Sequence, residues 1–412
     1  MRKTMRATPE GTRDLLFEEC QTRREAERRL SRLFRRRGFS EVMTPGMEFF
    51  DVFQAEDAPM IPADEMYKFT DTKGRLLVMR PDSTMPIARM TATRLQGAPL
   101  PLRLYYAQDV YHLHHGLTGR NDQEFQAGVE LIGAAGERAD LEVIALAAES
   151  LELFAGGQSE RTRIEIGHVG FFHSLVEALP VDREAKDDIR TLVETKNYAA
   201  LGDLLDALPP SEEVDALRRL PRLFGGVEVM DRARELCRGD GSREALDHLG
   251  RLYQALCRLG LADRVMIDLG LVHRNEYYTG VIFRGYIEGS GETVVSGGRY
   301  DALLQRFGSD LPATGFGVNV DALTKSMLDR GEGQPPLCPQ VLVHALPGRE
   351  TDALLMAGEL AAEGTVCECS VFDRWEDAWD YARRRGIPKV LAVGEETVAH
   401  DCPAEERNGG TR

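Results

Sequence analysis

Apolar residues recur every three or four positions between Glu18 and Arg37, where Ala26, Leu30, Leu33 and Phe34 form one stripe. This spacing predicts an amphipathic helix with one buried face. The arginines on its other face are interleaved with glutamates. That mixture is more typical of a solvated helix face than of an RNA-binding one.

Short strand-like runs and helices follow in turn. Helices are predicted at 83–95 and 137–154, and strands at 40–44, 75–80, 103–106, 110–112, 125–132 and 163–166. From 171 to 261 nearly all apolar spacing is helical, and proline and glycine break it into short pieces. Strands are predicted again at 264–270, 281–286 and 293–296. We therefore expect an α+β core over residues 1–330, with a helical insertion at about 171–261.

Residues 331–412 have a different pattern. The segment 331–339, GEGQPPLCP, is rich in glycine and proline and is predicted to be a linker. Residues 340–394 alternate between strand and helix patterns, which predicts a small α/β module. The polar residues 395–412 are expected to form a disordered tail.

Composition narrows the class of protein. Charged residues make up 29% of the chain and hydrophobic residues 42%, and the net charge is −16. No apolar run approaches the length of a membrane span, and the N-terminus lacks the apolar core of a signal peptide. The seven cysteines include no CxxC pair. We expect a reduced cytoplasmic protein without membrane contact, and the acidic balance makes nucleic-acid binding less expected.

Several polar and aromatic residues form a candidate pocket for an amino acid. Gln126 and Glu130 lie four apart in a predicted strand, so both side chains point to one face. An amide and a carboxylate placed in this way can hold an α-amino group. Further acceptors and a wall for a flat ring are offered by Asp82, Thr84, Tyr277 and Tyr278. The same residues also fit an ordinary sheet carboxylate beside core tyrosines, and spacing alone leaves both interpretations open.

Three histidines, His112, His114 and His115, raise the question of a metal site. His112 and His114 would share one strand face, but the spacing places no third ligand beside them. Cys367 and Cys369 likewise form only a pair. We expect no metal and no cofactor.

Four segments, taken in order, resemble those of class II histidyl-tRNA synthetases. The segments are PEGTRDLL with GFSEVMTP (9–16 and 38–45), LLVMRPDST (76–84), the block 102–133, and SGGRYDALLQRFG with PATGFGVNVDAL (296–323). The resemblance implies the antiparallel class II sheet with flanking helices. It also implies a set of histidine-binding residues, namely Asp82, Thr84, Arg120, Gln126, Glu130, Tyr277 and Tyr278. Asp82 departs from the glutamate that the synthetases have there.

The same alignment indicates that the catalytic groups have been lost. His112, His273 and Ala322 stand where the synthetases have arginines, and His114 replaces a glutamate. Arginines stabilise the negative charge that develops when a carboxylate attacks an ATP phosphate, and each such donor contributes about 2.7–4 kcal/mol. Losing three implies a rate loss of at least roughly 10⁴, even after discounting for non-additivity. The resemblance therefore implies a binding site without catalysis.

The segments DST, EYYTGVIF and PATGFGVNVD are similar to those of the regulatory subunits of ATP phosphoribosyltransferase. This implies a chain that dimerises through its class II core and joins short-form catalytic subunits in a hetero-octamer. That complex would perform the first step of histidine biosynthesis, with histidine as feedback effector. The C-terminal module resembles a shortened anticodon-binding domain without a basic run, so tRNA binding is not expected. The alternatives are a stand-alone amino-acid- or RNA-binding paralogue and an active histidine–tRNA ligase.

Overall fold

The structure is a computed structural model that describes residues 6–54, 61–114, 121–237, 239–272 and 277–403. The chain divides into two compact units, Met1–Gln334 and Pro335–Arg412. No described helix is both long enough and apolar enough to cross a membrane.

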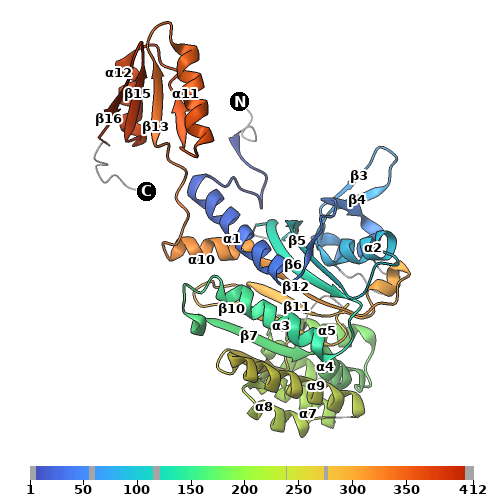
Figure 1. Cartoon of the computed structure of the whole chain (residues 1–412). Coiled ribbons are helices and arrows are strands. Elements are labelled where there is room, and N and C mark those ends of the chain that lie inside the picture. The colour runs from blue at the N-terminus through green and yellow to red at the C-terminus, as the bar shows by residue number, and fades with distance from the viewer. Residues whose placement is uncertain (1–5, 55–60, 115–120, 238, 273–276, 404–412) are drawn as a thin grey trace. The chain divides into compact units, whose positions relative to one another are not determined.

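A nine-stranded sheet forms the centre of the first unit (Figure 1). Most neighbours are antiparallel, and the exceptions are the parallel pairs β1–β5 and β7–β9. The strands, in spatial order, are β1 (Ser40–Glu41), β5 (Leu102–Tyr111), β6 (Gln123–Ile132), β12 (Ala313–Asn319), β11 (Val295–Arg299), β10 (Val281–Ile287), β7 (Thr162–His168), β9 (Val265–Asp268) and β8 (Phe224–Gly225). This mixed sheet with flanking helices confirms the expected α+β class.

Helices cover the sheet and bury its apolar side chains. In α1 (Phe17–Arg36), the residues Ala26, Leu30, Leu33 and Phe34 are all buried, which confirms the stripe predicted from their spacing. This helix packs on α10 (Val320–Asp329) and on the strands β5 and β6, and α3 (Glu137–Glu152) packs on β10 and β12. A small second sheet, β2 (Met47–Phe49), β4 (Leu76–Met79) and β3 (Lys68–Thr70), precedes α2 (Thr84–Arg94).

The strand β5 corrects one expectation. The sequence predicts two strands, 103–106 and 110–112, and the polar residues Gln108 and Asp109 lie between them. The structure has one continuous strand that ends at Tyr111. Gln108 is buried, yet its amide nitrogen donates to the hydroxyls of Ser83 (3.0 Å) and Thr44 (3.2 Å). A satisfied polar group can remain inside a strand, so its polarity did not mark a break.

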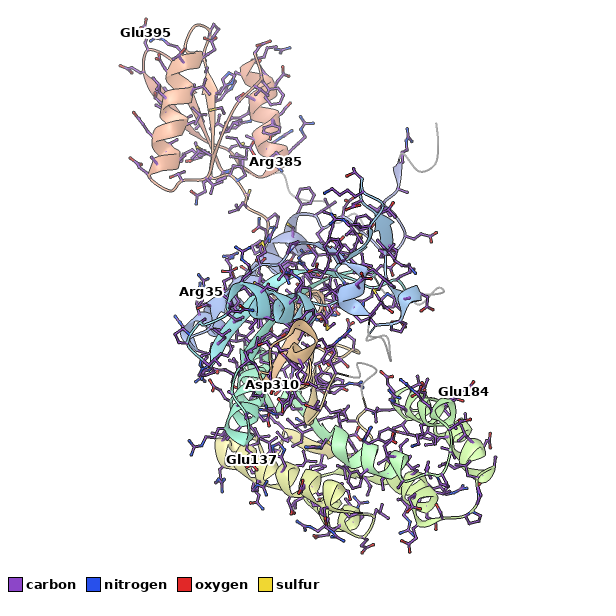
Figure 2. The ribbon with its side chains drawn as sticks, turned by 90° about the vertical axis from the view of Figure 1, so that its right-hand side faces the viewer. Arg35, Glu137, Glu184, Asp310, Arg385 and Glu395 are labelled. Carbon is purple, nitrogen blue, oxygen red and sulfur yellow. The ribbon has the colours of Figure 1, made fainter. Side chains whose placement is uncertain are left out.

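The insertion is mainly a set of helices below the main sheet in Figure 1. One of these helices carries Glu184, which is labelled in Figure 2. These helices are α4 (Val169–Glu177), α5 (Arg183–Glu194), α6 (Tyr198–Asp206), α7 (Glu212–Arg219), α8 (Glu228–Arg234) and α9 (Asp240–Leu256). The expectation of a helical insertion does not include β8, which pairs with β9 through Phe224–Asp268 and Gly225–Ile267. Its two residues are too few to show an alternation of polar and apolar positions.

The second unit is a four-stranded sheet in the order β14–β13–β15–β16. Its elements are β13 (Val341–Ala345), α11 (Glu350–Ala362), β14 (Cys367–Cys369), α12 (Trp375–Arg385), β15 (Lys389–Val393) and β16 (Thr397–Asp401). Both tryptophans of the chain lie on α12, with ring centres 5.6 Å apart. The ring of His400 on β16 lies 4.9 Å from that of Trp375.

The expectation of a disordered tail from residue 395 is wrong for Thr397–Asp401. These residues pair antiparallel with β15 along their whole length. Most of their side chains are exposed, because β16 is the edge strand. Its order comes from backbone hydrogen bonds and from the buried Cys402 that follows, so side-chain polarity misled the prediction.

Candidate functional site

A cavity of about 200 Å³ lies over β6, β11 and β12; we call it the central cavity. This volume suits one amino-acid-sized molecule and is below the roughly 300–1,000 Å³ of larger ligand sites. Six of the seven candidate residues from the sequence lie in its wall, namely Asp82, Thr84, Gln126, Glu130, Tyr277 and Tyr278. The seventh, Arg120, lies outside the described residues.

Glu130 is the most deeply placed acid of this cavity, with 1% of its surface exposed. One carboxylate oxygen accepts a hydrogen bond from the Thr84 hydroxyl at 2.7 Å, and the other accepts one from the Tyr300 hydroxyl. Burial raises the pKa of Glu130 to about 8, and the nearby carboxylate of Asp82 adds to the rise, although both hydroxyls oppose it. At pH 7 Glu130 is therefore mostly protonated, and a cation that enters the cavity would pair with its carboxylate only as the proton leaves.

Two glycines make room for the polar side chains of β6. Strands β6 and β12 pair with Gly315 opposite Glu130. A Cβ added to Gly315 would lie 1.9 Å from the Glu130 carboxylate, and one added to Gly317 would lie 2.8 Å from the Gln126 amide. These contacts are too short for any other residue, so the glycines of β12 determine where Glu130 and Gln126 lie.

Asp82 and Thr84 reach the cavity from the start of α2. One Asp82 carboxylate oxygen accepts a hydrogen bond from the backbone N–H of Met85 at 2.8 Å, which caps the helix. Burial raises the pKa of Asp82 to about 6, against the opposing effect of the Met85 and Thr84 backbone N–H groups. Asp82 thus has a structural function in addition to any contact with a ligand.

Tyrosines form the other wall of the cavity. The rings of Tyr277 and Tyr278 lie 4.7 Å apart, and Tyr300 meets Tyr277 edge-on at 5.7 Å. The Tyr106 hydroxyl donates to the Gln126 amide oxygen at 2.9 Å, which leaves the amide nitrogen as a donor. Aromatic faces beside carboxylates suit a cation or a flat polar ring.

The raised pKa values make stability depend on pH. Folded Glu130 keeps its proton to about pH 8, whereas an ordinary glutamate loses it near 4.5. Its contribution to the free energy of unfolding is therefore complete below pH 4.5 and lost as pH rises through 8. Glu130→Gln, which cannot ionise, should be more stable than the wild type by on the order of 1–3 kcal/mol at pH 8.5 and equally stable at pH 4.5. Urea unfolding at both pH values measures this, and a difference independent of pH would contradict it.

The positions that resemble lost arginines carry no positive charge where they are described. Burial, with the adjacent His114, lowers the pKa of His112 to about 4, so this residue of the cavity wall is neutral at pH 7. Ala322 is buried in the first turn of α10 and is not among the residues that line the cavity. His273 and His115 lie outside the described residues.

The described lining of the central cavity contains no arginine or lysine. It does contain three carboxylates, from Glu65, Asp82 and Glu130. Negative charge developing on a phosphate in this cavity would gain no stabilisation from those side chains. In the described parts of the chain, no three histidine, cysteine, aspartate or glutamate residues are arranged as a metal site. His114 instead lies with its Nδ1 3.1 Å from the Asp122 carboxylate.

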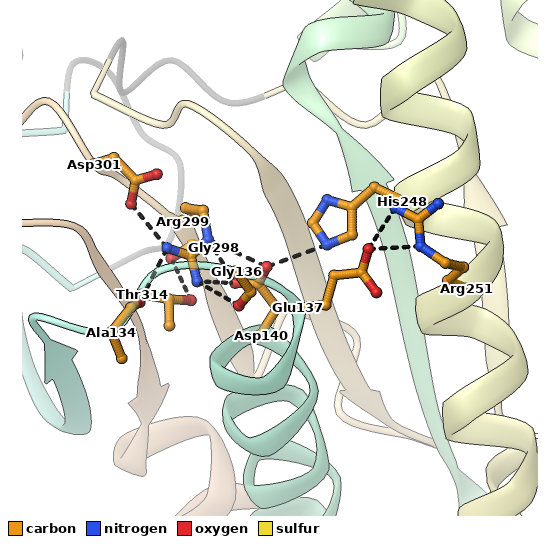
Figure 3. A network of polar contacts seen from close by, with 10 residues as sticks. All are labelled: Ala134, Gly136, Glu137, Asp140, His248, Arg251, Gly298, Arg299, Asp301 and Thr314. Atoms are coloured by element: carbon orange, nitrogen blue, oxygen red, sulfur yellow. Dashed lines mark hydrogen bonds and ion pairs between the residues drawn. The ribbon is translucent and has the colours of Figure 1, made fainter. Parts of the chain in front are cut away.

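A buried polar network anchors the cavity wall to the insertion (Figure 3). Arg299 precedes Tyr300 and pairs with Asp140, with Nη2 2.8 Å from the carboxylate. The guanidinium also donates to Asp301 at 2.9 Å. On the insertion side, His248 of α9 has Nε2 3.3 Å from Asp140. The network therefore connects the end of β11, the start of α3 and α9.

Sequence reasoning missed three groups that shape the cavity. In the sequence, Tyr300 stands in a glycine-rich segment and Tyr106 in a predicted strand, and neither position indicates a contact with the cavity. The two glycines Gly315 and Gly317 are spaced two apart, which places both on one strand face, and this signal was available in the sequence. The spacing of these glycines does not show that their strand pairs with the strand that carries Gln126 and Glu130.

Comparisons with known proteins agree with this geometry. The family model described as histidyl-tRNA synthetase matches residues 11–323. The ATP phosphoribosyltransferase regulatory subunit of Clostridium novyi (strain NT) is 37% identical over 396 residues, which cover 95% of this chain and 93% of the relative. That of Clostridium kluyveri is 39% identical and covers 93% of this chain and 98% of the relative.

Solved structures show the same relationship. A protein from Bacillus halodurans C described as an ATP phosphoribosyltransferase regulatory subunit/histidyl-tRNA synthetase has a TM-score of 0.78 and 30% identity, over 92% of this chain and 96% of that one. Histidyl-tRNA synthetase from Nostoc sp. PCC 7120 has a TM-score of 0.73 at 20% identity, over 96% and 97% of the two chains. This second likeness shows the shared fold.

Proposed function

Because the chain belongs to the family of ATP phosphoribosyltransferase regulatory subunits, built on the histidyl-tRNA synthetase fold, we propose that it binds free histidine in the central cavity and conveys feedback inhibition. The chain is a regulatory subunit, and catalysis lies in a partner ATP phosphoribosyltransferase chain. The complex performs the first step of histidine biosynthesis, in the cytoplasm.

The lining of the central cavity is the observation that carries this proposal. The α-ammonium group of histidine pairs with Glu130, and the Gln126 amide contacts the same end of the ligand. The imidazole ring lies against Tyr277 and Tyr278, whose rings are part of the wall. The carboxylates and the lack of cationic side chains in the described lining favour binding of an amino acid over activation of ATP.

Assembly follows from the family and from exposed apolar residues on the first unit. We propose a dimer through the class II core, joined to short-form catalytic subunits in a hetero-octamer. Met43, Met47, Phe49 and Leu76, on and near the small sheet, are all 40% exposed or more, which supports a protein contact there. Binding of tRNA has little support, because the net charge is −16.

The isolated chain should activate no amino acid. The residue at 112 is neutral, Ala322 lies in the core, and the sequence has a histidine at 273. We expect histidine-dependent ATP–pyrophosphate exchange at least roughly 10⁴-fold below that of an active synthetase assayed in parallel. Turnover within tenfold of the synthetase would favour a working ligase and refute the proposal.

Histidine should inhibit the mixture of this chain with its catalytic subunit and leave the catalytic subunit alone unaffected. Feedback requires that histidine bind two states of the complex with different affinities, and the coupling is reciprocal for substrate binding. Initial rates of phosphoribosyl transfer, measured with and without this chain over a histidine titration, decide it. Equal sensitivity in both samples would place the effector site on the catalytic subunit.

A further inference from the structure

A second cavity, of about 500 Å³, lies between the insertion helices α4 and α5 and the residues Leu271, Val272 and Tyr278; we call it the insertion cavity. Its volume is within the roughly 300–1,000 Å³ typical of sites for small organic ligands. Of the described residues that line it, only Tyr278 belongs to the candidate histidine site.

The two helices present different surfaces to this cavity, a charged one from α5 and a largely apolar one from α4. Arg183, Lys186, Asp187 and Arg190 line it at helical spacing, so one charged face of α5 points inward. On α4, the apolar side chains of Val169, Phe172 and Val176 line the facing wall at the same spacing. An apolar stripe usually packs against another apolar stripe. Here His173 and Glu177 of α4 also line the cavity, and the apolar stripe faces the charged side chains of α5, an arrangement that suits an amphipathic anion.

Carboxylates hold these cations in place. Lys186 Nζ lies 2.7 Å from the Glu177 carboxylate, and Arg190 pairs with Asp187. The Lys186 side chain is 18% exposed and that of Arg190 is 28% exposed, so both are partly withdrawn from solvent. The cavity therefore contains cationic donors from α5 and carboxylate acceptors from both helices.

We propose that the insertion cavity binds a nucleoside phosphate. Arginine and lysine donors match a phosphate group, and carboxylates accept hydrogen bonds from ribose hydroxyls. The wall formed by Phe172, Val176 and Leu271 suits the flat base. The phosphate, the ribose and the base thus correspond to the cationic, the carboxylate and the apolar side chains of the cavity.

Tyr278 lines both cavities. A nucleotide in the insertion cavity would contact this wall of the central cavity, so the two ligands would influence each other through Tyr278. The proposal of nucleotide binding does not rest on the proposed histidine site, and the two ligands are titrated separately.

The test is calorimetric titration of the full-length chain with adenosine and guanosine 5′-monophosphate, and with adenosine and inorganic phosphate as partial ligands. We expect both nucleotides to bind and the partial ligands to bind at least about tenfold more weakly. The double variant Arg183→Ala/Lys186→Ala removes two charge-assisted bonds and should weaken nucleotide binding by about tenfold or more. Arg219→Ala, an exposed cation at the end of α7 that does not line the cavity, is the control and should bind as the wild type does.

Three results would overturn the proposal. One is no nucleotide binding at millimolar concentration, and another is equal binding of inorganic phosphate. The third is binding that His112→Ala weakens and the double variant leaves unchanged, which would place the nucleotide in the central cavity. Histidine titrations of the same double variant separate the two sites, because loss of nucleotide binding with histidine binding retained is expected.

Discussion

Glu130→Ala is expected to weaken binding of free histidine by roughly 10- to 150-fold, because it removes the charged acceptor proposed for the α-ammonium group, a bond worth about 1.5–3 kcal/mol. The loss should lie towards the lower end of this range at pH 7, because buried Glu130 keeps its proton to about pH 8 and releasing that proton before pairing costs about 1.4 kcal/mol. Pairing with the cation in turn favours the charged form of the acid. Isothermal calorimetry of the purified chain measures the affinity directly.

Two further variants make this result specific. Glu130→Gln preserves the shape of the side chain and should lose most of the same affinity, because the charge is absent. Glu149→Ala removes a carboxylate that pairs with Arg37 elsewhere on the first unit, and it should bind histidine normally. Unchanged affinity in a folded Glu130→Ala chain would move the histidine site to the boundary with the catalytic subunit. Gln126 and Glu130 would then be structural remnants.

Asp140→Asn is expected to destabilise the first unit by about 3 kcal/mol, the lower end of the range for breaking a buried ion pair. Asp140 is fully buried and pairs with Arg299, which would be left in the interior without its main partner. The partly exposed Asp301 keeps one contact with the guanidinium, so a larger loss is not expected. The free energy of unfolding in urea, followed by far-UV circular dichroism, gives the size of the effect.

Asp240→Asn is the matched control for that experiment. Asp240 pairs with Arg243 one turn along α9, but its side chain is 91% exposed. Solvent screens such a pair, so its loss should leave stability unchanged within error. If the two variants proved equally stable, the network around Arg299 would have no structural importance.

Local pattern predicted the elements of this chain well, because each depends on residues close together in the sequence. The stripe through Ala26, Leu30, Leu33 and Phe34 needs only the helical period to be recognised. The shared face of Gln126 and Glu130 follows equally from the period of a strand. Errors arose where a polar residue was satisfied by a distant partner, as Gln108 is by Thr44 and Ser83.

The shape of the cavity depends on contacts that no local pattern contains. Gly315 determines the position of Glu130 only because β12 pairs with β6 in one register. Tyr300 donates to the same carboxylate from a segment 170 residues away. The resemblance to synthetases indicated which residues to consider, but the raised pKa of Glu130 follows from burial that only the folded chain shows.

Both tryptophans of the chain lie on α12 of the second unit, 5.6 Å apart and beside His400. Indole fluorescence therefore reports on residues 335–412 alone, and the first unit contributes only tyrosine emission. Unfolding of the two units can be followed at two excitation wavelengths in one sample, without labels or truncation. Stability changes caused by variants in the central cavity should alter the tyrosine signal and the circular dichroism, with the indole transition as an internal standard.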